Sequence, residues 1–338
     1  MDRTTKIKTR FALLKENAKA NELVKCTEGG DNVNADGLPT MQKIFYSSLP
    51  VEIPDDFLLP LQDPATIKVN QINWSKTTLP EYKGCYAVIL DNVINEAECN
   101  QLLHMAECSA GGHLGDESVP DHGWRPAMVN AGRNYEFLDM RYRNSDRIIW
   151  DNQDVMQRIW KRVLQGKGMK EYFSVLEGKK YKEVLGMKSD KWGDRWLISA
   201  NGPNERLRFL KYGPGQFFKP HCDGKYTTPD GKETSFYTMH LYLNDSAQAL
   251  DGLVDMNIDG GEEEMLQGGA TTFHGTRYQE ARLDADPKIG RVLIFQQRRL
   301  LHSGDEVVKG TKYTMRSDLM YSLDESDRGD EDGIVFGE

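Results

Sequence analysis

The sequence predicts an α+β protein that is mainly β, with a jelly-roll or sandwich core supported by helices from its N-terminal part. Short runs rich in β-branched and aromatic residues recur from residue 196 onward, and Gly-containing turns separate them. Two segments with helical periodicity come earlier in the chain. A chain of 338 residues is long for one domain, but jelly rolls with helical additions reach this length.

Composition along the chain suggests four parts. We expect residues 1–48 to form a polar arm that is helical in part, because they are low in β-branched residues and contain GGDNVNADG. Residues 49–195 are expected to supply a wrap and the supporting helices, 196–325 the β core, and 326–338 an acidic tail. The acidic, Gly-containing segment that starts at Asp245 is expected to be an exposed loop, which could close over a cavity mouth.

The first regular elements are a strand and two helices. The strand is CYAVILDNV, and the helix that follows it has Asn95 as a plausible N-cap, with acidic residues in its first turn. The second helix lies within DNQDVMQRIWKRVLQ, where either Asp151 or Asn152 is the cap. One face of that helix carries Val155, Ile159 and Val163, so we expect both helices to pack on a sheet.

The strand SFYTMHLYLND separates two sets of side chains, because alternate residues point to opposite faces. We expect one set to pack on the helices: Tyr237, Met239, Leu241 and Leu243. We expect the other set to line a polar cavity: Phe236, Thr238, His240 and Tyr242.

Charge and cysteine content restrict the class of protein. The net charge of −9 argues against a protein that binds nucleic acid by neutralising phosphates. Five cysteines without a CxxC motif indicate neither a disulfide framework nor a zinc ribbon. We found no secretory signal and no apolar run near the roughly 18 residues of a membrane span. We therefore expect a cytoplasmic protein with no nucleic-acid or membrane partner, and we leave its oligomeric state open.

Two imidazoles and one carboxylate form the most informative pattern. His221 and Asp223 in KPHCDG would point to one face of a strand, and His302 in LLHSGD would come from a distant strand. A lone His-x-Asp pair is more often a hydrogen-bonded surface pair. Together with His302, however, the pair offers one face of an octahedron with open positions opposite, as in non-haem Fe(II) oxygenases.

Such an iron site needs a co-substrate that fills two positions and leaves one for dioxygen. 2-Oxoglutarate does this, provided that a cation in the pocket holds its far carboxylate. Lys312 and Arg316 lie four residues apart in GTKYTMRSD and share a strand face, so either could serve. A further basic cluster, DMRYRNSDR, could line a substrate entrance and meet an anionic group, or could be a solvated, ion-paired face.

Longer motifs carry a resemblance to a known family: AVILDNVINEAEC, RFLKYGPGQFFKPHCDG, MHLYLND, GGATTF and RVLIFQQRRLLHSGDEVVKGTKY. In these residues, between about 85 and 323, the chain resembles Fe(II)/2-oxoglutarate oxygenases of the prolyl 4-hydroxylase type. The resemblance implies a double-stranded β-helix (jelly-roll or cupin-like), Fe(II), 2-oxoglutarate and O2, and usually L-ascorbate as reductant. The iron ligands of the family map onto His221, Asp223 and His302.

The same resemblance implies roles around the co-substrate. Tyr212 and Tyr242 look like hydroxyl donors to 2-oxoglutarate. The basic residue of the family maps onto Lys312, and Arg316 on the same face is the second choice. Strand parity also makes Thr238 and His240 candidate contacts of substrate or co-substrate.

The expected activity is oxidation of an unactivated C–H bond, with release of succinate and CO2. Hydroxylation is the default outcome, and desaturation or cyclisation are others. We expect a small-molecule substrate, such as an amino acid or specialised metabolite, because no second peptide-binding module or repeat accompanies the core. Peptidyl proline is the alternative substrate. Hypotheses of other classes are a non-catalytic jelly-roll binding protein and a hydrolytic zinc enzyme.

Overall fold

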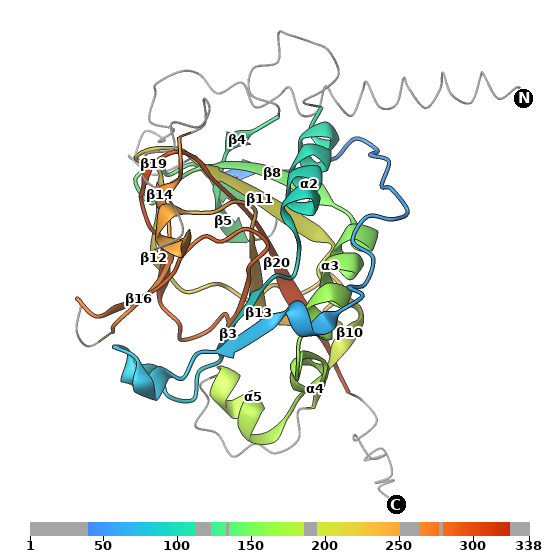
Figure 1. Ribbon diagram of the computed structural model, residues 1–338, viewed down its shortest axis with the longest axis vertical. Coiled ribbons are helices and arrows are strands. Elements are labelled where there is room, and N and C mark those ends of the chain that lie inside the picture. Colours follow the sequence, from blue (N-terminus) through green and yellow to red (C-terminus); the bar gives the residue numbers. More distant parts are fainter. Residues whose placement is uncertain are drawn as a thin grey trace, which may run out of the picture.

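The computed structural model describes residues 40–111, 123–132, 135–185, 195–250, 264–276 and 280–324. The expected helical arm falls almost entirely outside these residues, as do the acidic tail and most of the expected lid. Within them the chain is mainly β, with its strands in two principal antiparallel sheets (Figure 1). The predicted jelly-roll core is confirmed, and the boundaries of the four parts stay a prediction.

The larger sheet has ten strands and runs through both halves of the chain. Strands from the N-terminal part of the chain occupy both ends of this sheet. Residues before 195 therefore extend the sheet, in addition to the predicted wrap around it. In spatial order the strands are β2 (Lys68–Gln71), β3 (Ala87–Asp91), β17 (Val292–Gln296), β13 (Glu233–Tyr242), β20 (Lys312–Leu323), β11 (Arg206–Tyr212), β8 (Asp146–Asp151) and β4 (Arg125–Pro126), with β10 (Trp196–Pro203) paired to β20 and to β9 (Val175–Leu176).

The smaller sheet has five strands: β16 (Arg282–Ala285), β15 (Thr271–His274), β18 (His302–Gly304), β12 (Phe217–His221) and β7 (Arg143–Asn144). Two short sheets add β1 (Gln42–Lys43), β6 (Tyr135–Phe137) and β5 (Val129–Gly132), and β14 (Gln267–Gly268) with β19 (Val307–Lys309). In Figure 1 the helices lie beside β10 and β20, whereas β12, β14 and β16 lie on the opposite side. The smaller sheet therefore lies on the side of the larger sheet that faces away from the helices.

The helices are α2 (Glu96–Ser109), α3 (Gln153–Gln165), α4 (Met169–Ser174) and α5 (Gly178–Leu185). Asn95 caps α2 in a reciprocal capping box with Glu98, as the sequence predicted for the cap. Asn152, one of the two predicted caps, accepts a hydrogen bond from Val155 N at the start of α3. Short 3-10 turns complete the chain: Pro64–Thr66, Trp74–Lys76, Pro80–Tyr82 and Ala247–Leu250. None of the described helices has the length and apolar character needed to cross a membrane.

The main core lies between the larger sheet and the helices. Tyr237, Met239 and Leu241 of β13 are buried in it with the predicted face of α3. Phe236 was predicted to line the cavity, but it packs in the same core against Trp196. The reason is a register shift between Ser235 and Tyr237, because a β-bulge at this point interrupts the alternation of faces.

Candidate functional site

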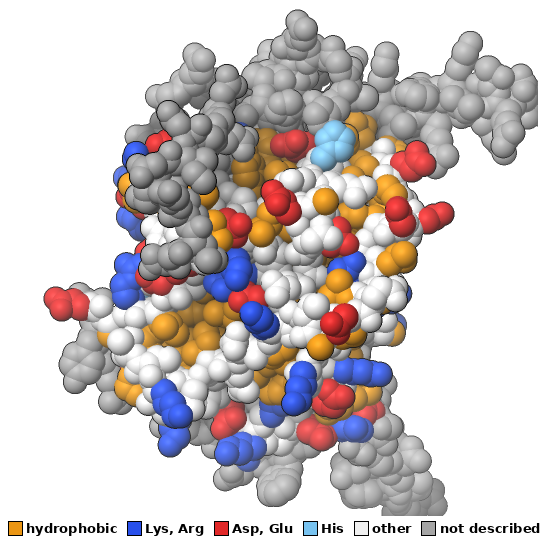
Figure 2. Space-filling model, in the orientation of Figure 1, with side chains coloured by type: hydrophobic (Ala, Val, Ile, Leu, Met, Phe, Trp, Pro, Cys, Tyr) orange, Lys and Arg blue, Asp and Glu red, His pale blue; other side chains and the backbone are white. Residues whose placement is uncertain are grey.

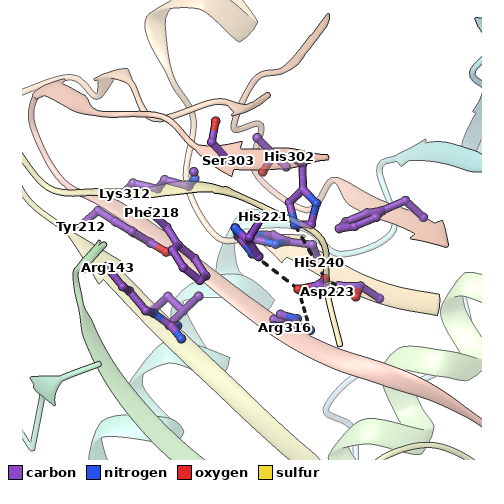
Figure 3. A pocket seen from close by; sticks show the side chains of 15 residues that line it. Arg143, Tyr212, Phe218, His221, Asp223, His240, His302, Ser303, Lys312 and Arg316 are labelled. Atoms are coloured by element: carbon purple, nitrogen blue, oxygen red, sulfur yellow. Dashed lines mark hydrogen bonds and ion pairs between the residues drawn. The ribbon is translucent and has the colours of Figure 1, made fainter. Parts of the chain in front are cut away.

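The site lies between the two principal sheets and centres on His221, Asp223 and His302. His221 and His302 are paired across strands β12 and β18 of the smaller sheet. Asp223 was expected on the same strand as His221, but β12 ends at His221 and Asp223 belongs to the segment that follows. One ligand atom from each residue lies within 4.8 Å of the others, close enough for a single metal ion (Figure 3).

Backbone carbonyls orient both imidazoles. Nδ1 of His221 is 2.8 Å from Lys219 O, and Nδ1 of His302 is 3.0 Å from Leu300 O. A carbonyl oxygen only accepts hydrogen bonds, so each Nδ1 carries the proton and each Nε2 presents a lone pair. Burial lowers the pKa of His302 to about 4, which keeps that ring neutral at physiological pH. Such outer hydrogen bonds are typical of metal-binding histidines.

Asp223 is held on both of its oxygens. Thr238 donates a hydrogen bond of 2.5 Å to Oδ2, and Nη2 of Arg316 lies 3.1 Å from Oδ1. Burial alone would raise the pKa of Asp223, but Arg316, and after it His302, hold this pKa well below its usual range. The carboxylate therefore stays ionised and oriented, as a metal ligand must be.

Lys312 is a buried ammonium group at the other end of the cavity. It is 1 % exposed, and its Nζ lies 5.1 Å from the ring centre of Tyr212 and 5.9 Å from that of Tyr242. No carboxylate of the described residues forms an ion pair with it. Burial lowers the pKa of Lys312 to about 8. A buried cation without a partner is costly, so this position is suited to an anionic ligand.

Arg316 has a different environment although it lies on the same strand, β20. Its guanidinium contacts both Asp223 and Asp318, at 3.1 and 3.3 Å. Lys312 and Arg316 both line the cavity, and which of them binds 2-oxoglutarate stays a prediction. Their charges are used differently, because Arg316 is already paired and Lys312 is not.

The other predicted residues divide between the cavity and its wall. Tyr212, Thr238 and His240 line the cavity, and Nε2 of His240 is buried without a hydrogen-bond partner. Tyr242 lies behind the lining, where its hydroxyl contacts Thr271 Oγ1 at 2.7 Å and Ala285 O at 3.2 Å. Its predicted contact with 2-oxoglutarate stays a prediction, and Thr271 is the residue that stands at the cavity surface.

Residues of the lining that the sequence did not single out come from the smaller sheet and from β11 and β17. They are Leu210, Phe218, Thr271, Phe295, Ser303 and Gly304. The ring of Phe218 stacks on the His221 imidazole, with centroids 3.8 Å apart and planes at 26°. Strand pairing brings this residue to the site, and apolar residues carry no chemical signal that would have revealed it.

Comparison with known proteins agrees with this geometry. Residues 207–317, from β11 into β20, match the family described as the 2OG-Fe(II) oxygenase superfamily. The matched segment contains the three proposed metal ligands, His221, Asp223 and His302. It also contains Lys312 and Arg316. Residues 207–317 therefore form a 2OG-Fe(II) oxygenase domain. Members of this superfamily use Fe(II), 2-oxoglutarate and O2.

Solved structures similar to this oxygenase include three prolyl hydroxylases. The viral collagen prolyl hydroxylase of Paramecium Bursaria Chlorella virus-1 is 16 % identical, with 70 % of this chain and 96 % of that chain covered and a TM-score of 0.36. A prolyl hydroxylase from Trichoplax adhaerens, solved with a hypoxia inducible factor peptide, is 14 % identical (72 % and 85 % covered, TM-score 0.39). A prolyl-4-hydroxylase from Pseudomonas putida is 13 % identical (69 % and 91 % covered, TM-score 0.37). The comparison with curated proteins returned no match.

The donor set of the oxygenase suits iron and 2-oxoglutarate. Two imidazoles and one ionised carboxylate occupy one side of the metal position, as in a two-His, one-carboxylate centre. The ammonium group of Lys312, which has no carboxylate partner among the described residues, lines the same cavity and can bind a second carboxylate. The chain is therefore a dioxygenase by family and by the chemistry of its buried residues, rather than a non-catalytic jelly roll.

Proposed function

We propose that this oxygenase binds Fe(II) through His221, Asp223 and His302, and that it oxidises a C–H bond of a small molecule such as an amino acid or specialised metabolite. The observation that carries the proposal is the shared orientation of the three donors, because two backbone carbonyls aim both imidazoles at the position beside Asp223. Bound iron and 2-oxoglutarate supply the oxidation: O2 gives one oxygen atom to the product and one to succinate, and CO2 leaves.

The protein residues position the reactants and exclude water. We assign the far carboxylate of 2-oxoglutarate to Lys312, with Tyr212 beside it and His240 as a further hydrogen-bonding group. Thr238 and Arg316 hold the carboxylate of Asp223 in place. Phe218 and Phe295 supply apolar walls, which keep the reacting C–H bond away from bulk water.

Small molecules are favoured over peptidyl proline because the cavity is closely walled by buried side chains from both sheets. Charged side chains of both signs are interspersed on the face shown in Figure 2. The described residues of that face therefore form no extended surface of one sign for a charged polypeptide. Hydroxylation is the expected reaction, and product masses would distinguish it from desaturation or cyclisation.

An anaerobic titration tests the proposed site. Adding Fe(II) and 2-oxoglutarate to the protein should produce a weak visible charge-transfer band, and succinate should form once air is admitted. His221→Ala should abolish both signals, whereas His104→Ala, on the exposed side of α2, serves as the matched control. Absence of both signals in the wild-type protein would overturn the proposal. A panel of amino acids, metabolites and proline-containing peptides, read by succinate release and mass spectrometry, then decides the substrate class.

A further inference from the structure

Three arginines are buried among the residues that the structure describes: Arg143, Arg147 and Arg162. Arg147 pairs with Glu136 at 2.6 Å, and Arg162 pairs with Glu98 at 2.7 Å. No described carboxylate pairs with Arg143, whose Nε has no partner and whose Nη1 makes one contact of 3.5 Å with Met128 O. A buried guanidinium without a counter-ion is rare, because desolvation of the charge is then uncompensated.

Arg143 also lies at the site. It is 8 % exposed, it belongs to β7 of the smaller sheet, and it lines the cavity that contains the three metal-binding donors. Its guanidinium carbon is 4.7 Å from the ring centre of Phe218, and Phe218 in turn stacks on His221. In Figure 3 the Phe218 ring lies between Arg143 and His221. The Phe218 ring thus separates the guanidinium of Arg143 from His221 at the proposed metal position.

The two cations of the cavity come from different sheets, so we assign them to different anions. Lys312 is assigned to 2-oxoglutarate and lies on β20 of the larger sheet, whereas Arg143 comes from the smaller sheet. The 2-oxoglutarate molecule has one far carboxylate, which a single cation satisfies. A second anion is therefore needed to compensate Arg143, and the remaining ligand of the site is the substrate.

We infer that Arg143 binds a carboxylate of the substrate, so that this oxygenase acts on a small carboxylic acid and holds it across the Phe218 ring from His221. The inference rests on the proposed function. A guanidinium whose face is covered by an aromatic ring keeps its edges free for bidentate binding of a planar carboxylate. Because the ring separates the anion from the metal position, the oxidised carbon is removed from the carboxylate by several bonds.

Paired substrates test this inference. Succinate release should be measured with free amino acids and N-acetyl amino acids, each beside its primary amide, which is neutral at the same position. We expect the acids to stimulate release and their amides to do so at least about tenfold less well, since one charge-assisted contact is lost. For the best acid, Arg143→Met should raise KM about 10- to 100-fold. The matched control is Arg141→Met, because the side chain of Arg141 is 86 % exposed.

A stability measurement gives a second readout that needs no substrate. If Arg143 is uncompensated in the free protein, Arg143→Met should leave Tm unchanged or raise it by about 2 °C or more. A structural arginine would instead give a lower Tm when replaced. A lower Tm for Arg143→Met would overturn the inference. So would loss of the 2-oxoglutarate charge-transfer band in this variant, or amides that stimulate succinate release as well as the acids do. A wild-type protein that forms no succinate with any compound would refute the proposed function, while the Tm comparison still tests Arg143.

Discussion

Nη2 of Arg316 lies 3.1 Å from Oδ1 of Asp223, so a half-buried cation contacts a carboxylate that we assign to iron. The same guanidinium contacts Asp318, which also pairs with Arg208 at 3.0 Å. Arg316 thus orients Asp223 from behind and is itself held by a second carboxylate. This arrangement makes it a positioning residue rather than a ligand.

Removing that contact should weaken metal binding. We expect Arg316→Met to lower the affinity for Fe(II) about 10- to 100-fold, because residues that orient metal ligands contribute this much. Anaerobic calorimetric titration would measure the change. The control is Arg208→Met, which removes a partner of Asp318 but leaves the Asp223 contact. Tighter Fe(II) binding by Arg316→Met would show instead that repulsion between the Arg316 guanidinium and Fe(II) outweighs the orienting effect of Arg316 on Asp223.

Replacing Lys312 and replacing Arg316 should have different effects on the affinity for 2-oxoglutarate. At saturating Fe(II), Lys312→Met should raise the Kd for 2-oxoglutarate about 10- to 100-fold, because an unpaired ammonium loses its carboxylate contact. Arg316→Met should change this Kd much less, since its guanidinium is already paired. The charge-transfer band reports both values. Equal losses in the two variants would contradict the assignment to Lys312.

Binding of 2-oxoglutarate should depend on pH through Lys312, whose pKa burial lowers to about 8. Below pH 8 the amine is protonated in the free protein and binds the anion directly. Above pH 8 the amine is neutral, so binding must also take up a proton and the apparent affinity should fall about tenfold per pH unit. Lys312→Arg, which stays charged, should remove this decline. Titrations from about pH 7 to about pH 9.5 would show it, and a flat profile in the wild type would contradict it.

Gly290 should be a sensitive position for stability. It has φ +69°, and an added Cβ would lie 1.7 Å from Ile94 O, an impossible contact with backbone. Gly215 also has a positive φ, +77°, but a Cβ there meets nothing within 4 Å. Both Ala substitutions carry the cost of a left-handed backbone, so their difference isolates the clash. By urea denaturation we expect Gly290→Ala to lose about 2 kcal/mol or more beyond Gly215→Ala. Similar losses would show that the loop relaxes.

Local patterns in the sequence predicted much of this architecture because they depend on near neighbours along the chain. The capping role of Asn95 follows from side chains within one turn, and the buried face of α3 follows from helical period. The alternation along β13 placed Thr238 and His240 at the cavity, as observed. It was wrong for Tyr242, which packs behind the lining. It was also wrong for Phe236, because a β-bulge is a property of two paired strands and has no clear signal in one of them.

By itself, the sequence determined the chemistry available: His221, Asp223 and His302 as donors, and Lys312 and Arg316 as alternative cations on one strand face. Only the tertiary structure decided how those charges are used. Arg316 is neutralised because the segment after β12 brings Asp223 to it, and Lys312 is left unpaired because no described carboxylate reaches its end of β20. Likewise Arg141 is exposed to solvent, Arg147 contacts Glu136, and Arg143 lines the cavity without a carboxylate partner among the described residues. Charge pairing depends on which distant segments become neighbours, and that information lies in the packing of the two sheets.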